Sequence, residues 1–240
     1  MFRFYLILIY ILLPQLGFTA GFSFDFGDGN VTSKIVQTIG LVTVLSLAPS
    51  ILVMVTSFTR IVIVFSFLRS AIGLQQSPPN SVLISLALFL TGFIMMPTFE
   101  TSYKNGILPL TQEKLSEADA MPKIIQPFKE FMLKHTREKD LGLFLSIAKK
   151  DDIKSPTDID LTIVIPSFMI SELKRAFEIG FLIFIPFLII DVLISSILMA
   201  MGMMMLPPVM ISLPFKLIFF VIIDGWYMIC GSLIKSYGIS

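Results

Sequence analysis

The sequence predicts an all-α membrane protein, with two related, kinked helical hairpins flanking a small polar helical subdomain. Three observations predict this fold: an excess of apolar residues, apolar segments interrupted by proline and glycine, and an internal repeat. The 240 residues are 55% hydrophobic and 15% charged, with a mean hydropathy of +0.87. A soluble domain averages roughly 45–50% apolar and about 25% charged residues. Lipid or partner subunits must therefore cover part of the apolar surface.

Composition and motifs argue against several classes of function. The net charge of +1 gives no reason to expect binding to nucleic acid. The single cysteine, Cys230, excludes an internal disulfide framework, and the single histidine, His135, argues against a histidine-based metal site or catalytic triad within one subunit. No phosphate-binding loop, C-x-x-C or H-E-x-x-H motif is present. We therefore expect no enzyme, no catalytic residues, no metal and no cofactor.

The first 20 residues have the pattern of a secretory signal peptide. Arg3 supplies a positive charge, residues 4–13 form a short apolar core, and small residues follow up to Ala20. The core is too short for a membrane-spanning helix. Phe18 is an imperfect fit to cleavage after Ala20, so a retained anchoring segment is the alternative. A cleaved leader would place the mature N-terminus outside the inner membrane.

Composition divides the remaining chain into four parts. A short polar N-terminal segment (21–34) precedes the first hairpin (35–99), a polar helical subdomain (100–162) and the second hairpin (163–240). The subdomain holds most of the charge, and its abundance of charge places it in water. Apolar residues recur there at helical spacing, which predicts amphipathic helices through Phe128, Phe131, Met132 and His135, and through Leu141, Phe144, Leu145 and Ala148.

The apolar parts are not simple spanning helices. Proline in a helix interior removes a hydrogen bond and kinks the chain, and Pro49, Pro186 and Pro214 all fall inside apolar runs. The run 81–96 is followed by Pro97, which we expect to close it. At a rise of 1.5 Å per residue that run covers about 24 Å, less than a ~30 Å hydrocarbon layer.

Five charged residues interrupt the apolar runs and are expected to be buried against protein: Arg60, Glu178, Asp191, Lys216 and Asp224. The alternative is four tilted spanning helices whose charges snorkel at their ends, which suits Lys216 better than the short Asp191. Lys216 and Asp224 are eight residues apart, about 80° in projection on one helix. Asp191 and Asp224 could be proton-relay groups, but buried pairing with Lys216, Arg60 or a neighbouring subunit is favoured.

An internal repeat relates the two apolar parts. A shift of 129 residues aligns A-x-G-x-x-x-x-P-P in both, each preceded and followed by an apolar helix. Glycine suits the C-terminus of the first helix, and the proline pair suits the turn and the start of the second. Residues 58–79 and 187–208 are therefore expected to be superposable. The turn residues are Gly73, Pro78 and Pro79 in the first hairpin, and Gly202, Pro207 and Pro208 in the second.

The second turn is rich in methionine. Six methionines occur among the twelve residues 199–210: Met199, Met201, Met203, Met204, Met205 and Met210. Methionine is long, unbranched and polarizable, so a cluster of this density favours a deformable apolar surface over ordinary core filling. The equivalent positions of the first turn, residues 74–77, carry L-Q-Q-S. The two turns therefore serve different purposes.

Two segments resemble signatures of the FliP family of type III secretion export-gate proteins. Residues 49–80 are PSILVMVTSFTRIVIVFSFLRSAIGLQQSPPN, and residues 177–226 are FEIGFLIFIPFLIIDVLISSILMAMGMMMLPPVMISLPFKLIFFVIIDGW. Together they span most of both apolar parts, whereas the leader and the polar middle match less well. The leader and the total length favour the flagellar branch over the virulence branch.

The resemblance implies a role that composition alone does not indicate. Five FliP-like subunits and one FliR form a right-handed helical cone with FliQ, in contact with FlhB, at the inner membrane and the flagellar basal body. Unfolded flagellar proteins pass through its centre, driven by the proton motive force and an ATPase. A methionine-rich loop closes the pore, and by match it corresponds to Met203, Met204 and Met205. We place the polar subdomain on the periplasmic side.

Two other function classes compete with this interpretation. Internal repeats and broken helices with acidic residues also occur in secondary transporters of small solutes. A transporter would act as a monomer or simple dimer, whereas a gate subunit should co-purify with other membrane proteins. A membrane enzyme ranks third, because no nucleophile and base pair or metal-binding group is evident.

Overall fold

The computed structural model describes residues 31–149, 158–203 and 206–238. The expected signal peptide and most of the polar segment 21–34 lie outside these residues. The chain divides into two compact units, Met1–Leu47 and Ala48–Ser240. The first is described only from Val31, where α2 begins. All further packing described below belongs to the second unit.

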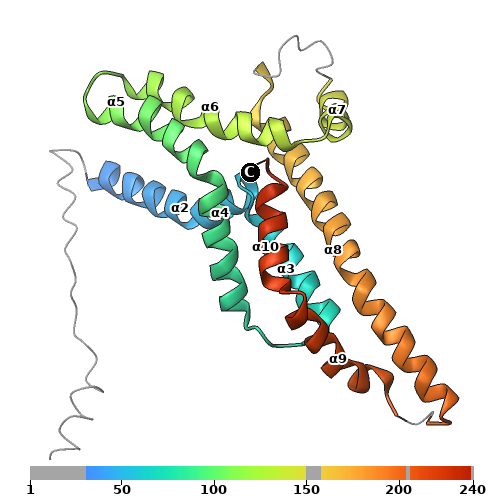
Figure 1. Cartoon of the computed structure of the whole chain (residues 1–240). Helices are drawn as coiled ribbons and strands as arrows, with labels where there is room; N and C mark the ends of the chain where they lie inside the picture. Colours follow the sequence, from blue (N-terminus) through green and yellow to red (C-terminus); the bar gives the residue numbers. More distant parts are fainter. Residues whose placement is uncertain (1–30, 150–157, 204–205, 239–240) are drawn as a thin grey trace, which may run out of the picture. The chain divides into compact units, whose positions relative to one another are not determined.

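The described residues contain helices and no strand, which confirms the all-α prediction. Figure 1 labels them in chain order. They are α2 (Val31–Val55), α3 (Phe58–Ile72), α4 (Asn80–Ser102), the π-helix η1 (Tyr103–Ile107), α5 (Leu108–Thr111), α6 (Glu117–His135), α7 (Glu138–Ile147), α8 (Leu161–Ala200), α9 (Pro208–Ile222) and α10 (Gly225–Lys235).

Two of the described helices are long and apolar enough to cross a membrane. They are the continuous helical stretch Asn80–Thr111 and α8. Two bent pairs, Pro49–Val55 with Phe58–Ile72 and Pro208–Ile222 with Gly225–Lys235, also qualify if each is one broken span, and their bends are 86° and 61°. The 40 residues of α8 cover about 60 Å, roughly twice the hydrocarbon thickness. The fold is therefore that of a helical membrane protein with broken helices.

The expectation that Pro97 ends its helix is wrong. α4 continues through it to Ser102, and α8 continues through both of its internal prolines. Each proline removes one backbone hydrogen bond. The remaining hydrogen bonds of a long helix can hold it together across such a gap. The sharp bends occur instead where α2 meets α3 and where α9 meets α10.

The two hairpins end their first helices in the same way. Gly73 and Gly202 both have positive φ, 90° and 74°. The Gly73 amide bonds the Ser70 carbonyl and the next amide bonds the carbonyl five residues back, and the same pair of bonds recurs at Gly202. This is the Schellman arrangement, in which a left-handed residue satisfies the last carbonyls of a helix. Both glycines thus lie where the 129-residue repeat predicts.

The repeat extends to the inner faces of α4 and α9. Three positions spaced four apart are buried on each helix, and they correspond under the same shift: Leu83, Ala87 and Thr91 on α4, and Ser212, Lys216 and Phe220 on α9. The face is apolar or weakly polar in the first hairpin and carries a lysine in the second. The two modules therefore share a framework but differ in what they bury.

The first helices of the two hairpins, α3 and α8, pack side by side and run in the same direction. Gly180 makes this approach possible, because a Cβ there would lie 2.5 Å from the Phe67 ring. Contacts follow the same order along both helices: Arg60 with Glu172, Phe67 with Phe177 at 5.0 Å between ring centroids, and Ala71 with Phe187 in one core cluster. α8 then continues 13 residues beyond Phe187 to Ala200.

The polar middle of the chain is helical, as predicted. α6 begins at Ser116, whose hydroxyl accepts a hydrogen bond from the Asp119 amide at 3.2 Å. Acidic residues occupy its first turn and basic residues its last, which suits the helix dipole. Its apolar face contributes Met132 to a cluster with Val164 and Phe168 of α8. The middle helices therefore pack directly on the second hairpin.

Gly106 allows η1 to lie against α6. A Cβ at this position would be 2.4 Å from the Ile124 side chain and 3.0 Å from its backbone nitrogen. Because backbone cannot move aside cheaply, Gly106→Ala should lower the free energy of unfolding by about 1–3 kcal/mol. Gly142→Ala is the matched control, since nothing lies within 4 Å of the added carbon. Both variants would be unfolded by heat in detergent. Equal unfolding temperatures for the two would contradict this prediction.

Candidate functional site

A buried ion pair joins the first helices of the two hairpins. The Arg60 guanidinium of α3 donates from Nε to Oε2 of Glu172 at 2.9 Å and from Nη2 to Oε1. Both side chains are completely buried. Such a two-bonded pair has fixed geometry, and its desolvation is offset only while both partners remain. The predicted burial of Arg60 is thus observed, and its partner is one that the sequence did not reveal.

The C-terminal end of α10 completes this cluster. Arg60 Nη1 donates to the Ser236 hydroxyl at 2.9 Å, and its guanidinium carbon lies 3.8 Å from the centroid of the Tyr237 ring. The Tyr237 hydroxyl donates to Oε2 of Glu172. Burial and the neighbouring Glu172 charge both raise the pKa of Tyr237, so it stays a hydrogen-bond donor at physiological pH.

A second ion pair lies within the second hairpin. Lys216 Nζ of α9 donates to Asp191 Oδ2 of α8 at 2.6 Å and to the Ala71 carbonyl at the end of α3 at 3.2 Å. The Ser212 hydroxyl donates to the other Asp191 oxygen at 2.6 Å. Lys216 is buried, whereas the Asp191 side chain is 36% exposed. The expected pairing of Asp191 with Lys216 is therefore present.

The other two charges that the sequence predicts to be buried are exposed in the single chain. Glu178 pairs with Lys174 one turn earlier on the outer face of α8, and its side chain is 57% exposed. Asp224 is also exposed and has φ 50°, in the joint between α9 and α10. Because α9 ends at Ile222, Asp224 and Lys216 do not share one straight helix. That expectation was wrong because the apolar run continues unbroken to Ile223, and the turn signal at the break, Asp224-Gly225, was not weighed.

The described methionines of the second turn are exposed. Met199, Met201, Met203 and Met210 are all at least 43% accessible. Met204 and Met205 lie outside the described residues. The described methionines are therefore not packed into the core of their own hairpin, which leaves a flexible apolar surface at the end of α8.

The turn of the first hairpin is cross-linked by a side chain. Arg69 Nη1 donates to the Pro78 carbonyl at 3.3 Å and to the Asn80 amide oxygen at 2.6 Å. The position equivalent to Arg69 in the second hairpin is Leu198, which has no polar side-chain atom to make such bonds. The second turn therefore lacks the side-chain cross-link that Arg69 makes in the first.

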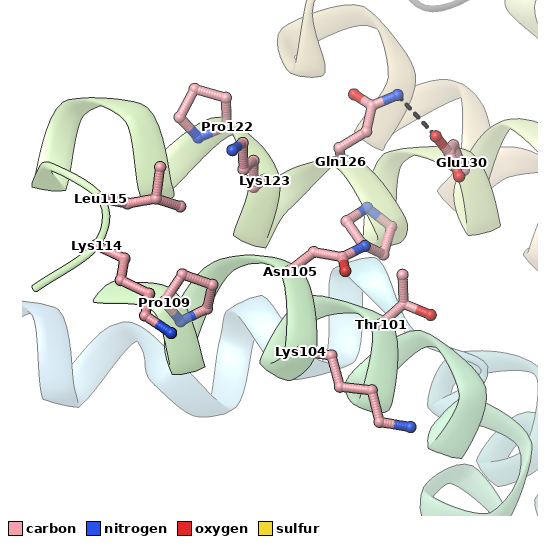
Figure 2. A pocket seen from close by; sticks show the side chains of 11 residues that line it. Thr101, Lys104, Asn105, Pro109, Lys114, Leu115, Pro122, Lys123, Gln126 and Glu130 are labelled. Carbon is pink, nitrogen blue, oxygen red and sulfur yellow. Dashed lines mark hydrogen bonds between the residues drawn. The ribbon is translucent and has the colours of Figure 1, made fainter. Parts of the chain in front are cut away.

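A groove of about 780 Å³ lies between η1 and α6. Figure 2 shows its mixed lining, with lysines, prolines and polar side chains. Lys104 is paired with Glu100 at 2.8 Å, and Gln126 donates to Glu130 at 2.9 Å. Within the part of the chain that the structure describes, no three His, Cys, Asp or Glu side chains are grouped to hold a metal ion. The groove is a mixed surface without an arrangement of groups for catalysis.

Sequence reasoning missed Glu172 and Tyr237. Glu172 stands in a polar stretch, S-E-L-K-R, which reads as an exposed turn of helix. Tyr237 lies near the C-terminus, where aromatic residues carry no distinctive pattern. The one available signal was the unpaired Arg60 in an apolar run, which requires a buried acidic partner.

Replacing Asp191 tests the second ion pair. Asp191→Leu should lower the free energy of unfolding by about 2 kcal/mol, because it leaves a buried ammonium with fewer hydrogen bonds. Asp191→Asn should cost less, since its amide oxygen can still accept from Ser212 or Lys216. Thermal unfolding and secretion of substrate would both be measured. A leucine variant that unfolds and secretes like wild type would remove the need for a polar partner.

Three features place this protein in the class of helical membrane proteins built from repeated hairpins. They are broken apolar helices, ion pairs between those helices, and exposed methionines on either side of the second turn. The sequence matches the model of the FliP family over residues 41–233. That match covers most of the chain, so this protein belongs to the FliP family.

Relatives of similar length carry the same name. The chain is 56% identical over 214 residues to the flagellar biosynthetic protein FliP of Bacillus subtilis, with 89% of this chain and 97% of the relative covered. It is 55% identical over 212 residues to that of Rhizobium meliloti, covering 88% and 86%. It is 50% identical over 235 residues to that of Aquifex aeolicus, covering 94% and 98%.

Proposed function

We propose that this protein is a core subunit of the flagellar type III protein export gate. With FliQ and FliR it would form the channel through which unfolded flagellar proteins cross the inner membrane. Membership of the FliP family and the printed names of the relatives support the flagellar role. Five copies, contact with FlhB, a cleaved leader and a periplasmic position for residues 100–162 complete the proposal.

The exposed methionine-rich turn is the observation that carries the gate function. It follows α8, the longest of the described helices, and its described methionines are left uncovered. In an assembled ring, Met203, Met204 and Met205 would meet their counterparts at the axis. A ring of thioethers can close an empty pore and deform around a passing chain, because dispersion contacts need no fixed geometry.

The outer surface supports assembly with other helices. Large apolar side chains are exposed along α8, among them Phe177, Phe181 and Leu182, which are 58–69% accessible. The Glu178 and Lys174 pair lies on the same stretch. Charge beside apolar surface is costly against lipid, so neighbouring subunits are the better cover for this face.

A secondary transporter is the competing function, because inverted or repeated hairpins with membrane acids also occur there. In this chain the charges of Arg60 and Asp191 are already paired, with Glu172 and Lys216 respectively. Both oxygens of the buried Glu172 carboxylate accept hydrogen bonds from within the chain. These four charged side chains are therefore better placed to hold helices together than to bind a solute. Among the residues that the structure describes, no arrangement of side chains supports an enzymatic role.

Native mass spectrometry after gentle detergent extraction tests the proposal. An export-gate subunit should be released as a complex containing about five copies of this chain together with smaller membrane proteins. Extraction from a strain lacking those partner proteins is the control. A monomer or simple dimer that retains no partner, extracted under the same conditions, would favour the transporter.

A further inference from the structure

The two residues that follow α10, Ser236 and Tyr237, contact three other helices at one buried point. Tyr237 is 4% exposed. Its ring stacks on Phe131 of α6 at 5.9 Å and lies over Arg60 of α3, while its hydroxyl donates to Glu172 of α8. Ser236 accepts from the same arginine. We refer to Ser236 and Tyr237 with these contacts as the C-terminal clasp.

His135 forms one wall of the clasp. Its ring centroid lies 5.0 Å from that of Tyr237, and Nδ1 is 2.8 Å from the Phe131 carbonyl within α6. The ring is nearly buried, but it lines a groove of about 410 Å³ together with Tyr237 and Lys134. Solvent and protons can therefore reach the only histidine of the chain.

We propose that His135 is a proton-binding site that controls the C-terminal clasp: protonation of its ring loosens Tyr237 and releases α10 from α3, α6 and α8. Nothing in the sequence of the chain suggests this, because the contacting residues are far apart. The clasp is a property of the chain itself and does not depend on the proposed role in export.

The charges around His135 explain the effect of a proton. From α3 the Arg60 guanidinium faces the cluster, and from α8 Glu172 faces it, so the two together are neutral. From α10 the facing group is the neutral Tyr237 hydroxyl, and α4 lines the groove with uncharged residues. On its own side His135 is flanked by Lys134, Glu130 and the ion pair of Arg137 with Asp140. A protonated ring would add one positive charge to a balanced, buried cluster.

Burial is the largest influence on His135, and it lowers the pKa of the ring below its ordinary value. The Phe131 carbonyl, Glu172 and the backbone of Tyr237 favour the proton, Arg60 opposes it, and the effect of burial outweighs those that favour it. A lowered pKa means that the closed clasp binds the proton more weakly than the open one. Acid therefore favours opening, from the ordinary pKa of about 6.5 downward.

A joint in the chain allows α10 to move once released. Asp224, in the left-handed region with φ 50°, separates α9 from α10 at a bend of 61°. α9 remains fixed on the far side of this joint by the pair Lys216–Asp191. Leu233 and Trp226 of α10 also pack in the core clusters. Release of Tyr237 would therefore loosen the C-terminal end of α10 without unfolding the rest of the second hairpin.

The single cysteine of the chain reports on α10. Cys230 is half-buried and packs against the first core cluster. The full-length chain in detergent is alkylated with a maleimide, and the rate at Cys230 is measured. That rate is divided by the rate at which the same maleimide alkylates glutathione at the same pH. Both thiols are mostly protonated below pH 7.5, so the ratio removes the direct effect of pH on thiolate. Fluorescence of Trp226, also on α10, gives a second measurement.

For wild type the ratio should rise between pH 7.5 and 5.5 by up to about tenfold, because pH 5.5 lies about one unit below the ordinary histidine pKa of about 6.5. His135→Gln should keep the low ratio at both pH values. Tyr237→Ala should show the high ratio at both. A wild-type ratio that does not change with pH overturns the proposal, whatever the variants do. So does a His135→Gln variant that responds like wild type.

Discussion

Replacing Glu172 with leucine should destabilise the protein by about 3–5 kcal/mol, among the largest effects of any single substitution in the chain. The change leaves the Arg60 guanidinium fully buried with no counter-charge. It also removes the acceptor of the Tyr237 hydroxyl, so one substitution leaves three buried donor atoms, two on Arg60 and one on Tyr237, without their acceptor. Unfolding by heat or denaturant in detergent would measure the loss.

Two further variants separate charge from packing. Glu172→Gln keeps an acceptor oxygen but no charge, and it should fall between wild type and leucine. The double variant Arg60→Met with Glu172→Leu should recover much of the lost stability, because replacing both partners of a buried pair is often neutral or better. A double variant that is less stable than Glu172→Leu alone would show that the arginine is well solvated without its partner.

Replacing Met203, Met204 and Met205 together with alanine should make the membrane leak ions while the complex still assembles. Three alanines per subunit would leave a wider pore than three methionines. A hydrophobic constriction blocks ions only when it is narrow enough to stay dry. Ion leakage, protein level and secretion would be recorded in the same cells. The expected result is a large rise in leakage at an unchanged protein level.

The repeat supplies a matched control for this experiment. Positions 74–76 of the first turn, Leu74, Gln75 and Gln76, correspond to the three methionines under the 129-residue shift. Alanine at these positions should leave the membrane tight. A tight membrane in the methionine variant would place the seal elsewhere, and a variant that fails to assemble would indicate that the methionines are core residues.

The hairpin framework could be predicted because its signals are local. Gly73 and Gly202 have no Cβ to oppose positive φ, and both end helices in the structure. The start of α6 follows from a serine cap with acidic residues in its first turn. In each case neighbouring residues determine the backbone.

The ion-pair partners could not be predicted, because they are distant in the chain. Arg60 and Glu172 are 112 residues apart, and Arg60 and Ser236 are 176 apart. Pairing at that distance depends on how helices pack, which no local pattern describes. The continuation of α4 through Pro97 was also not predicted, because the hydrogen bonds on either side of the proline hold the helix together.

Cross-linking of a stalled substrate to the second turn tests the central claim most directly. A photo-reactive residue replaces Met203 in cells whose export is blocked by a substrate with a folded C-terminal domain. The same residue at Gln75, exposed in the equivalent turn, is the control. The gate function predicts a cross-link between substrate and position 203, with little at position 75. Export that is blocked without any cross-link at 203 would contradict the claim that this turn lines the export path.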